Sequence, residues 1–215
     1  MRFSIKETLL LLFSFLPYFY LYTLWATLPQ QVPTHFDFNG VANDWSSKYF
    51  LLFLPCGLGI IFYFIFKALP YLDPKKKLEQ MGNLYTKLRF IVCIFITSLS
   101  LYILSVTASG SMKNMSLLFV LLGFFFAFLG NYFQAIRPNY FVGIRTPWTL
   151  ESEAVWRKTH LLGGRLWMIG GLLISLLAFI IPATIFPEIF LGIVAIICVV
   201  PIVYSWLEFR KEKME

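Results

Sequence analysis

The chain has 215 residues, of which 59% are hydrophobic and 13% are charged, and its mean hydropathy is +0.74. Soluble domains contain about 45–50% apolar and about 25% charged residues, so this composition excludes a soluble enzyme, a disordered chain and a secreted disulfide scaffold. The net charge of +7 takes its meaning from where the charges lie along the chain. The composition therefore predicts an integral membrane protein.

Six apolar runs without a charged residue follow one another along the chain, and each is 18 to 21 residues long. About 20 helical residues cross a hydrocarbon core of about 30 Å. Apolar side chains cover every face of these runs, which disfavours the alternating strands of an outer-membrane barrel. The sequence therefore predicts an all-α, polytopic integral membrane protein with six transmembrane helices. The predicted spans are Thr8–Leu28, Tyr49–Phe66, Phe90–Ala108, Ser116–Ile136, Leu166–Ile185 and Ile189–Leu207.

Lysine and arginine residues are divided very unevenly between the two sides of these spans. One side carries 16 of the 18 basic residues and both termini, whereas the other side carries Lys48 and Lys113. Acidic residues divide eight to three, which leaves a net charge of +8 on the first side and −1 on the second. Because the basic side of a membrane protein faces the cytoplasm, we expect both termini inside the cell. The net charge then reflects topology, and no direct nucleic-acid binding is expected.

Residues that carry chemistry are scarce within the predicted spans. Cys56, Cys93 and Cys198 all lie inside spans and at no metal or disulfide spacing, which argues against both roles. Ionisable residues inside a membrane usually mark transport pathways, and the six predicted spans contain none. We therefore expect no metal, no cofactor and no catalytic residue, and the pattern disfavours a transporter or exporter.

The largest predicted outer loop, residues 29–48, has the sequence PQQVPTHFDFNGVANDWSSK. Asn39-Gly40 is a tight-turn signal, so we expect a small ordered hairpin or lid. His35 and Asp37 are two residues apart, on one side of an extended segment, and Asp44 is within reach across the turn. These side chains are compatible with a metal or acid–base site; the plainer alternative is a hydrogen-bonded polar loop that lies on the lipid headgroups.

The largest predicted inner loop, residues 137–165, has the sequence RPNYFVGIRTPWTLESEAVWRKTHLLGGR. Thr146-Pro147 predicts a helix start, because proline suits the first helical position. Residues 148–160 form a roughly amphipathic segment, which predicts a short helix in the membrane interface, and Gly163-Gly164 is expected to end it. Two roles stay open for this loop. It is either a re-entry segment anchored by tryptophans, or a docking site for a cytoplasmic partner or for anionic headgroups.

These two loops resemble known sequence signatures. The outer loop resembles the signature of a small bacterial membrane domain of uncharacterised function, and the inner loop resembles that of the SdpI family, immunity proteins against the sporulation-delaying toxin of bacilli. The outer-loop residues that match are Pro29, Pro33, His35, Gly40, Asp44, Trp45, Ser47 and Lys48. The inner-loop residues that match are Asn139, Gly143, Ile144, Arg145, Thr146, Pro147, Trp148, Thr149, Trp156, Thr159 and His160.

The resemblance implies a multi-pass protein of the bacterial cell membrane that protects its producer from a secreted toxin peptide. It also implies a role in signalling, in which a cytoplasmic transcriptional repressor is held at the membrane once toxin is present. The expected partners are membrane lipids, the toxin peptide and this repressor. We expect a two-helix unit over residues 1–70, with the outer loop, and a four-helix unit over residues 71–215, with the inner loop.

Two sets of site residues follow as hypotheses, both for binding and neither for catalysis. The Lys75–Lys77 run is expected to add to the cytoplasmic docking face. The expected toxin contacts are His35, Asp37, Asp44, Trp45 and Lys48. The expected docking residues are Asn139, Gly143, Arg145, Thr146, Pro147, Trp148, Trp156 and His160, with Arg145 and Trp148 favoured. The alternatives to an immunity protein are a transporter or exporter, and a membrane metalloenzyme that uses His35, Asp37 and Asp44.

Overall fold

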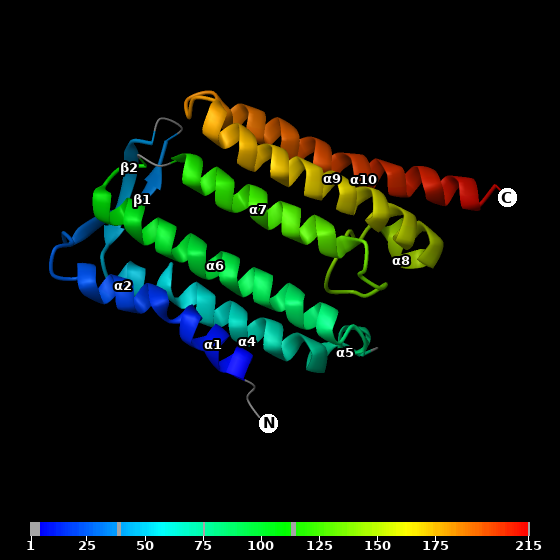
Figure 1. Cartoon of the computed structure of the whole chain (residues 1–215), viewed down its shortest axis with the longest axis horizontal. Coiled ribbons are helices and arrows are strands. Elements are labelled where there is room, and N and C mark those ends of the chain that lie inside the picture. The colour runs from blue at the N-terminus through cyan, green and yellow to red at the C-terminus, as the bar shows by residue number, and fades with distance from the viewer. Residues whose placement is uncertain (1–4, 38–39, 75, 113–114, 215) are drawn as a thin grey trace. The chain divides into compact units, whose positions relative to one another are not determined.

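The computed structural model describes residues 5–37, 40–74, 76–112 and 115–214 (Figure 1). Within them, six helical stretches are long and apolar enough to cross a membrane, which confirms the six predicted spans. The elements in chain order are α1 (Ile5–Ser14), α2 (Leu16–Leu24), β1 (Gln31–Phe36), β2 (Ala42–Ser47), α3 (Phe50–Phe53), α4 (Cys56–Leu72), α5 (Lys77–Gln80), α6 (Asn83–Ser109), α7 (Met115–Phe133), α8 (Pro147–Glu151), α9 (Glu153–Ile180) and α10 (Phe186–Glu212).

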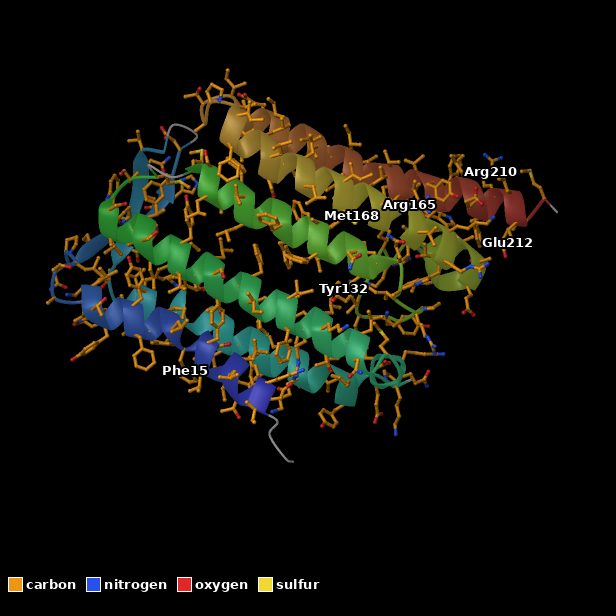
Figure 2. All side chains as sticks on the ribbon, viewed as in Figure 1. Phe15, Tyr132, Arg165, Met168, Arg210 and Glu212 are labelled. Carbon is orange, nitrogen blue, oxygen red and sulfur yellow. The ribbon has the colours of Figure 1, made fainter. Side chains whose placement is uncertain are left out.

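Each of the six stretches keeps a large apolar surface outside the protein core. Only 22% to 44% of the residues in their most apolar windows are buried within the chain. The side chains in Figure 2 surround the helices, and exposed large apolar residues such as Phe19, Phe64 and Phe179 occur on several of them. A water-soluble chain does not tolerate so much contiguous apolar surface, so these faces are suited to contact with lipid.

The helices extend beyond the predicted spans at several ends. Helix α6 begins at Asn83 and α9 at Glu153, whereas charge-free composition predicted starts at residues 90 and 166. A charged residue does not by itself end a membrane helix, because long basic side chains near a helix end keep their charged groups in the polar region of the membrane. The prediction that Gly163-Gly164 ends an interfacial helix is wrong: both glycines lie inside α9.

By their contacts, residues Met1–Lys67 and Arg89–Leu121 form a first compact unit, unit 1. Its core includes a cluster of buried apolar residues from α2, the hairpin, α3, α4 and α6: Leu21, Leu28, Val32, Leu51, Cys56 and Leu104. A second cluster, from α1, α4 and α6, consists of Leu10, Tyr63 and Cys93. The first cluster includes a residue of the outer loop, so the hairpin is part of the core of unit 1.

Strands β1 and β2 form an antiparallel hairpin that confirms the predicted ordered loop. Pro33 pairs with Trp45 and His35 with Asp44, and the register shifts on both sides of His35. Gly40 has φ = 76°, a conformation that glycine adopts without strain. Its N–H donates to the Asp37 carbonyl oxygen at 2.9 Å. Asn39, the other half of the predicted turn, lies outside the described residues.

Residues Ala68–Leu88 and Leu122–Glu215 form unit 2, in which α9 and α10 lie side by side (Figure 1). Helices α7 and α9 approach so closely that only glycine fits at their contact. A Cβ on Gly164 would lie 2.7 Å from the Gly130 carbonyl oxygen, and one on Gly123 would lie 2.6 Å from the Gly171 carbonyl oxygen. This packing explains why Gly164 is helical. The domain boundary expected at residue 70 stays a prediction.

Candidate functional site

The β1–β2 hairpin presents most of the predicted toxin-contact residues at its surface. His35, Asp44 and Trp45 are exposed, with Trp45 at 53%. His35 Nδ1 lies 2.5 Å from Asn43 Oδ1, and Asp44 Oδ1 accepts a hydrogen bond from the Trp45 backbone N–H at 2.9 Å. Asp37 Oδ1 accepts from the Val41 N–H at 2.8 Å and thereby fixes the turn. The hairpin therefore brings the polar residues together through local hydrogen bonds.

A metal site does not form from these residues. Over the described parts of the chain, no group of three or more His, Cys, Asp and Glu side chains is arranged to hold a metal ion. His35 and Asp44 are cross-strand neighbours, and their side chains form hydrogen bonds with Asn43 and with the Trp45 backbone N–H. The contact of this polar loop with lipid headgroups, the plainer alternative, stays a prediction.

Lys48 is buried, which is unusual for a charged side chain. Its Nζ donates to the Trp25 carbonyl oxygen at 3.3 Å, and the same nitrogen lies 4.7 Å from the centroid of the Trp25 ring. A lysine that donates to a carbonyl at the end of a helix also interacts favourably with the helix dipole. Lys48 therefore attaches the base of the hairpin to the end of α2, and its contact with a toxin stays a prediction.

An apolar cavity of about 340 Å³ lies in unit 1 between the hairpin, α3, α4 and α6. The turn of the hairpin closes against the chain after α6, since the Met112 N–H donates to the Gly40 carbonyl oxygen at 3.3 Å. No motif in the sequence signals this cavity, because its walls come from segments far apart in the chain. Residues that line it include Pro33, Phe36, Leu51, Leu54, Leu58, Tyr102, Ile103, Val106 and Met112. We call it the hairpin cavity.

A buried ion pair connects the first and third spans within unit 1. The Arg89 guanidinium donates to the Glu7 carboxylate, and Tyr63 Oη donates to Glu7 Oε2 at 3.2 Å. Lys67 Nζ donates to Tyr63 Oη at 3.3 Å. The search for charge-free runs missed this pair, because Glu7 and Arg89 each lie one residue before a predicted span. Both belong to helices long enough to cross the membrane.

In unit 2, the inner signature folds around the amide of Asn139. Its Nδ2 donates to the carbonyl oxygens of Arg137 and Val142 at 2.8 and 3.0 Å, and its Oδ1 accepts from the N–H groups of Phe141 and Val142 at 2.8 and 2.7 Å. Both ends of this buried side chain are thus satisfied, as burial of an amide requires. Asn139 defines the shape of the loop that follows α7.

His160 joins this loop to α9. Its Nε2 accepts a hydrogen bond from the Ile144 N–H at 2.9 Å, and its Nδ1 lies 2.9 Å from the Trp156 carbonyl oxygen. Because a backbone N–H can only donate, Nε2 is unprotonated and the proton is assigned to Nδ1. A Cβ at Gly143, where φ is 115°, would collide with this ring. The absence of a side chain at Gly143 therefore leaves the space that the His160 ring occupies.

Trp156 packs beneath His160, with their ring centroids 4.0 Å apart. Its indole Nε1 donates to the Ile136 carbonyl oxygen at 2.8 Å, and the side chain is almost fully buried. The carbonyl oxygens at the end of a helix need partners outside the helix, and the indole supplies one just beyond α7. Trp156 was predicted to lie in a helix at the membrane interface; it is helical and buried in unit 2, and its position relative to the membrane stays a prediction.

The predicted helix start at Thr146-Pro147 is confirmed. Thr146 caps α8 through a reciprocal pair of hydrogen bonds with Thr149, and Pro147 takes the first helical position. Thr146 Oγ1 also lies 3.0 Å from Ser205 Oγ on α10. Helix α8 is short, and α9 begins directly after it with Ser152 as its cap. The amphipathic segment is therefore divided between two capped helices.

The predicted docking residues fall into two groups. Asn139, Thr146, Trp156 and His160 are buried and hold the loop together, with the half-buried Gly143 against the His160 ring, whereas Arg145 and Pro147 are exposed and Trp148 is half-buried. The Arg145 guanidinium donates to the Tyr140 carbonyl oxygen, which orients its side chain. Only the exposed group is accessible to a partner without unfolding of the loop.

The basic run before α5 approaches the same loop. Lys77 lines a small cavity of about 120 Å³ together with Asn139, Tyr140 and Leu150. Lys75, the first residue of the predicted docking run, lies outside the described residues. On α10, Glu208 is buried and its carboxylate accepts from Lys158 Nζ at 2.7 Å and Lys211 Nζ at 3.1 Å. No local pattern in the sequence signals the Lys158–Glu208 pair, because its partners lie on separate helices, α9 and α10.

Comparisons with known proteins match both signature segments. Residues 135–205 match the model of the SdpI/YfhL protein family, and residues 12–64 match a domain of unknown function, DUF1648. The chain is 26% identical over 180 residues to the Immunity protein SdpI of Bacillus subtilis (strain 168), and the alignment covers 83% of each protein. No solved structure matches the chain.

Proposed function

We propose that this chain, whose resemblance to the SdpI family is confirmed by the matched segments, is a membrane immunity protein that protects its producer from a secreted toxin peptide. Six helices that can cross a membrane identify it as a multi-pass membrane protein. The structural observation that supports a binding function is the hairpin cavity of about 340 Å³. Its walls are mostly apolar, as expected of a site that accepts part of a membrane-active peptide.

The hairpin cavity is suited to an apolar side chain of such a peptide. Burial of one Leu- or Phe-sized side chain stabilises a complex by about 1.5–3 kcal/mol. Trp45 on β2 and Tyr49 shortly after it are exposed, and aromatic residues of this kind often dominate binding interfaces. Asp44 is exposed while Lys48 is buried, so the accessible carboxylate favours a peptide with basic residues near its apolar anchor.

This mechanism requires that the hairpin face the outside of the cell. The distribution of charge, +8 on the side of both termini and −1 on the side of the hairpin, supports that orientation through the positive-inside rule. In this orientation the toxin meets the hairpin before it reaches the inner loops. The capture or exclusion of toxin then takes place at the outer boundary of the membrane.

Survival of a toxin-sensitive strain that expresses the protein is the direct test. Ile103→Trp fills the hairpin cavity from α6 and should abolish protection, while Ile103→Val leaves the cavity open and should preserve it. Ile61→Trp places the same bulky ring on a face of α4 where the native side chain is 50% exposed, so it should also preserve protection. Protection by Ile103→Trp at normal membrane levels would exclude the cavity as the toxin site.

We propose in addition that the exposed residues of the inner signature bind a cytoplasmic repressor when toxin is present. Support comes from the resemblance and from the exposure of Arg145 and Pro147 in an otherwise buried signature. Arginine offers a planar, permanently charged set of donors to a partner. Arg145→Ala should prevent toxin-dependent recruitment of a fluorescently tagged repressor to the membrane, whereas Arg210→Ala should not. Loss of the Arg145 variant from the membrane would instead assign the residue a structural role.

Two other functions have distinct experimental signatures. A transporter or exporter would show substrate-dependent flux in proteoliposomes. A membrane metalloenzyme that uses His35, Asp37 and Asp44 would purify with bound metal, which elemental analysis detects. Our proposal is a binding function without catalysis, and either result would replace it.

A further inference from the structure

A second cavity, of about 390 Å³, lies in unit 2 between the chain that follows α7 and the first turns of α9. Two arginines, Arg137 and Arg157, line it together with one carboxylate, that of Glu153. Both arginines are exposed, and within the described residues neither forms an ion pair. The apolar part of the wall comes from Ala135, Ile136, Pro138, Ala154 and Trp156, and Gln134 completes it.

The two arginines lie at the same end of the close contact between α7 and α9. Gly123 faces Gly171, and Gly130 faces Gly164 seven residues further along α7. On α9, Arg157 lies seven residues before Gly164, and Arg137 lies four residues after Phe133, the last residue of α7, so both arginines lie at the same end of this helix pair. Arg137 follows directly after Ile136, the last residue of the charge-free run. The arginines therefore lie where the apolar run of this span ends, which is where lipid headgroups are expected.

Two acceptors at the cavity, a carbonyl oxygen and a carboxylate, could compete with a ligand for the arginines, and each has another interaction. The Ile136 carbonyl oxygen already accepts the indole N–H of Trp156 at 2.8 Å. Glu153 lies in the first turn of α9, where its charge interacts favourably with the helix dipole. Among the described lining residues, two cations and one anion leave a net positive charge. A ligand with a negative charge and an apolar portion satisfies both parts of the wall.

We infer that this cavity binds the phosphate group of an anionic phospholipid, with Arg137 and Arg157 as the phosphate contacts. Guanidinium groups form charge-assisted, often bidentate hydrogen bonds to phosphate. Basic pockets between transmembrane helices on the cytoplasmic side bind anionic headgroups in other proteins. The lipid is favoured over a soluble phosphate because the cavity combines its arginines with apolar residues at the end of the membrane-spanning run.

The test measures binding of phosphatidylglycerol to the full-length protein in phosphatidylcholine nanodiscs at about 0.15 M salt, where charges further apart than about 8 Å are screened. The double variant Arg137→Gln/Arg157→Gln should bind phosphatidylglycerol about thirty-fold more weakly. The matched control, Lys87→Gln/Arg210→Gln, removes the same charge from exposed positions on α6 and α10 (Arg210 is labelled in Figure 2). It should change the affinity by less than about threefold.

Three outcomes would overturn the inference. An equal loss in the control pair would show that the attraction is non-specific. Competition by glycerol 3-phosphate at the concentration at which phosphatidylglycerol binds would assign the site to soluble phosphates. Binding that is unchanged in the arginine pair would remove the site altogether. Arg137→Lys/Arg157→Lys keeps both charges and should retain most of the binding, which separates loss of the site from misfolding of the glutamine variant.

Discussion

The close contact between α7 and α9 in unit 2 gives a prediction whose size follows from the structure. Replacing Gly164 by Ala would place a methyl group 2.7 Å from the Gly130 carbonyl oxygen and 2.8 Å from Gln134 Cγ. Favourable contacts between non-bonded heavy atoms lie at about 3.5–4.0 Å, so α7 and α9 must separate by almost an ångström. Overpacking of this kind costs about 1–3 kcal/mol.

Gly192→Ala on α10 is the matched control, because a Cβ there meets nothing within 4 Å. In a helix, alanine is more favourable than glycine by about 0.5–1 kcal/mol, so the control should be neutral or slightly stabilised. Unfolding of the two variants by sodium dodecyl sulfate in mixed micelles, followed by circular dichroism, measures the difference. If Gly164→Ala unfolds at the same detergent fraction as Gly192→Ala, the close approach of α7 and α9 is wrong.

Three further predictions concern topology and buried polar contacts. Val41→Cys, at a hairpin position that is 61% exposed, should react with a membrane-impermeant maleimide in intact cells; reaction only after lysis would reverse the proposed orientation. His160→Phe keeps the ring but leaves the Ile144 N–H unpaired, so it should lower stability by about 1–3 kcal/mol, and a thermal midpoint equal to that of the parent would contradict this. Glu7→Gln leaves the Arg89 charge buried without its partner, at a cost of about 3–5 kcal/mol. Glu7→Gln/Arg89→Gln should recover part of that loss, and a double variant no more stable than the single one would show that the pair is not coupled.

The sequence determines the number of spans but not their ends. Apolar runs of about 20 residues identify membrane helices because lipid offers no partner for backbone polar groups. Outside the hydrocarbon that constraint disappears, and propensity, capping and packing decide where a helix stops. Ser152 caps α9 fourteen residues before Leu166, where the apolar run of its span begins. Gly163-Gly164 suggested a break in the helix, but Gly164 instead permits close contact between α9 and α7. This role becomes visible only when the partner helix is known.

The sequence predicted where the candidate site lies but not what each of its residues does. The turn signal and the helix start predicted the hairpin and α8 because both are local features. Whether Asn139 or His160 points outward depends on partners at Val142, Ile144 and Trp156, which a linear pattern does not reveal. The hairpin cavity and the Glu7–Arg89 pair depend on residues separated by tens of positions. These features follow from tertiary packing and carry no local signature.

The two proposed binding surfaces predict an order of events that can be tested genetically. If toxin binds at the hairpin cavity and the repressor at Arg145, then filling the cavity with Ile103→Trp should remove both protection and recruitment of the repressor. Arg145→Ala should remove recruitment alone, because capture of toxin does not depend on the repressor. The reverse pattern, with recruitment intact in the cavity variant, would require that toxin be sensed elsewhere. That result would leave the immunity function standing and remove the hairpin cavity from it.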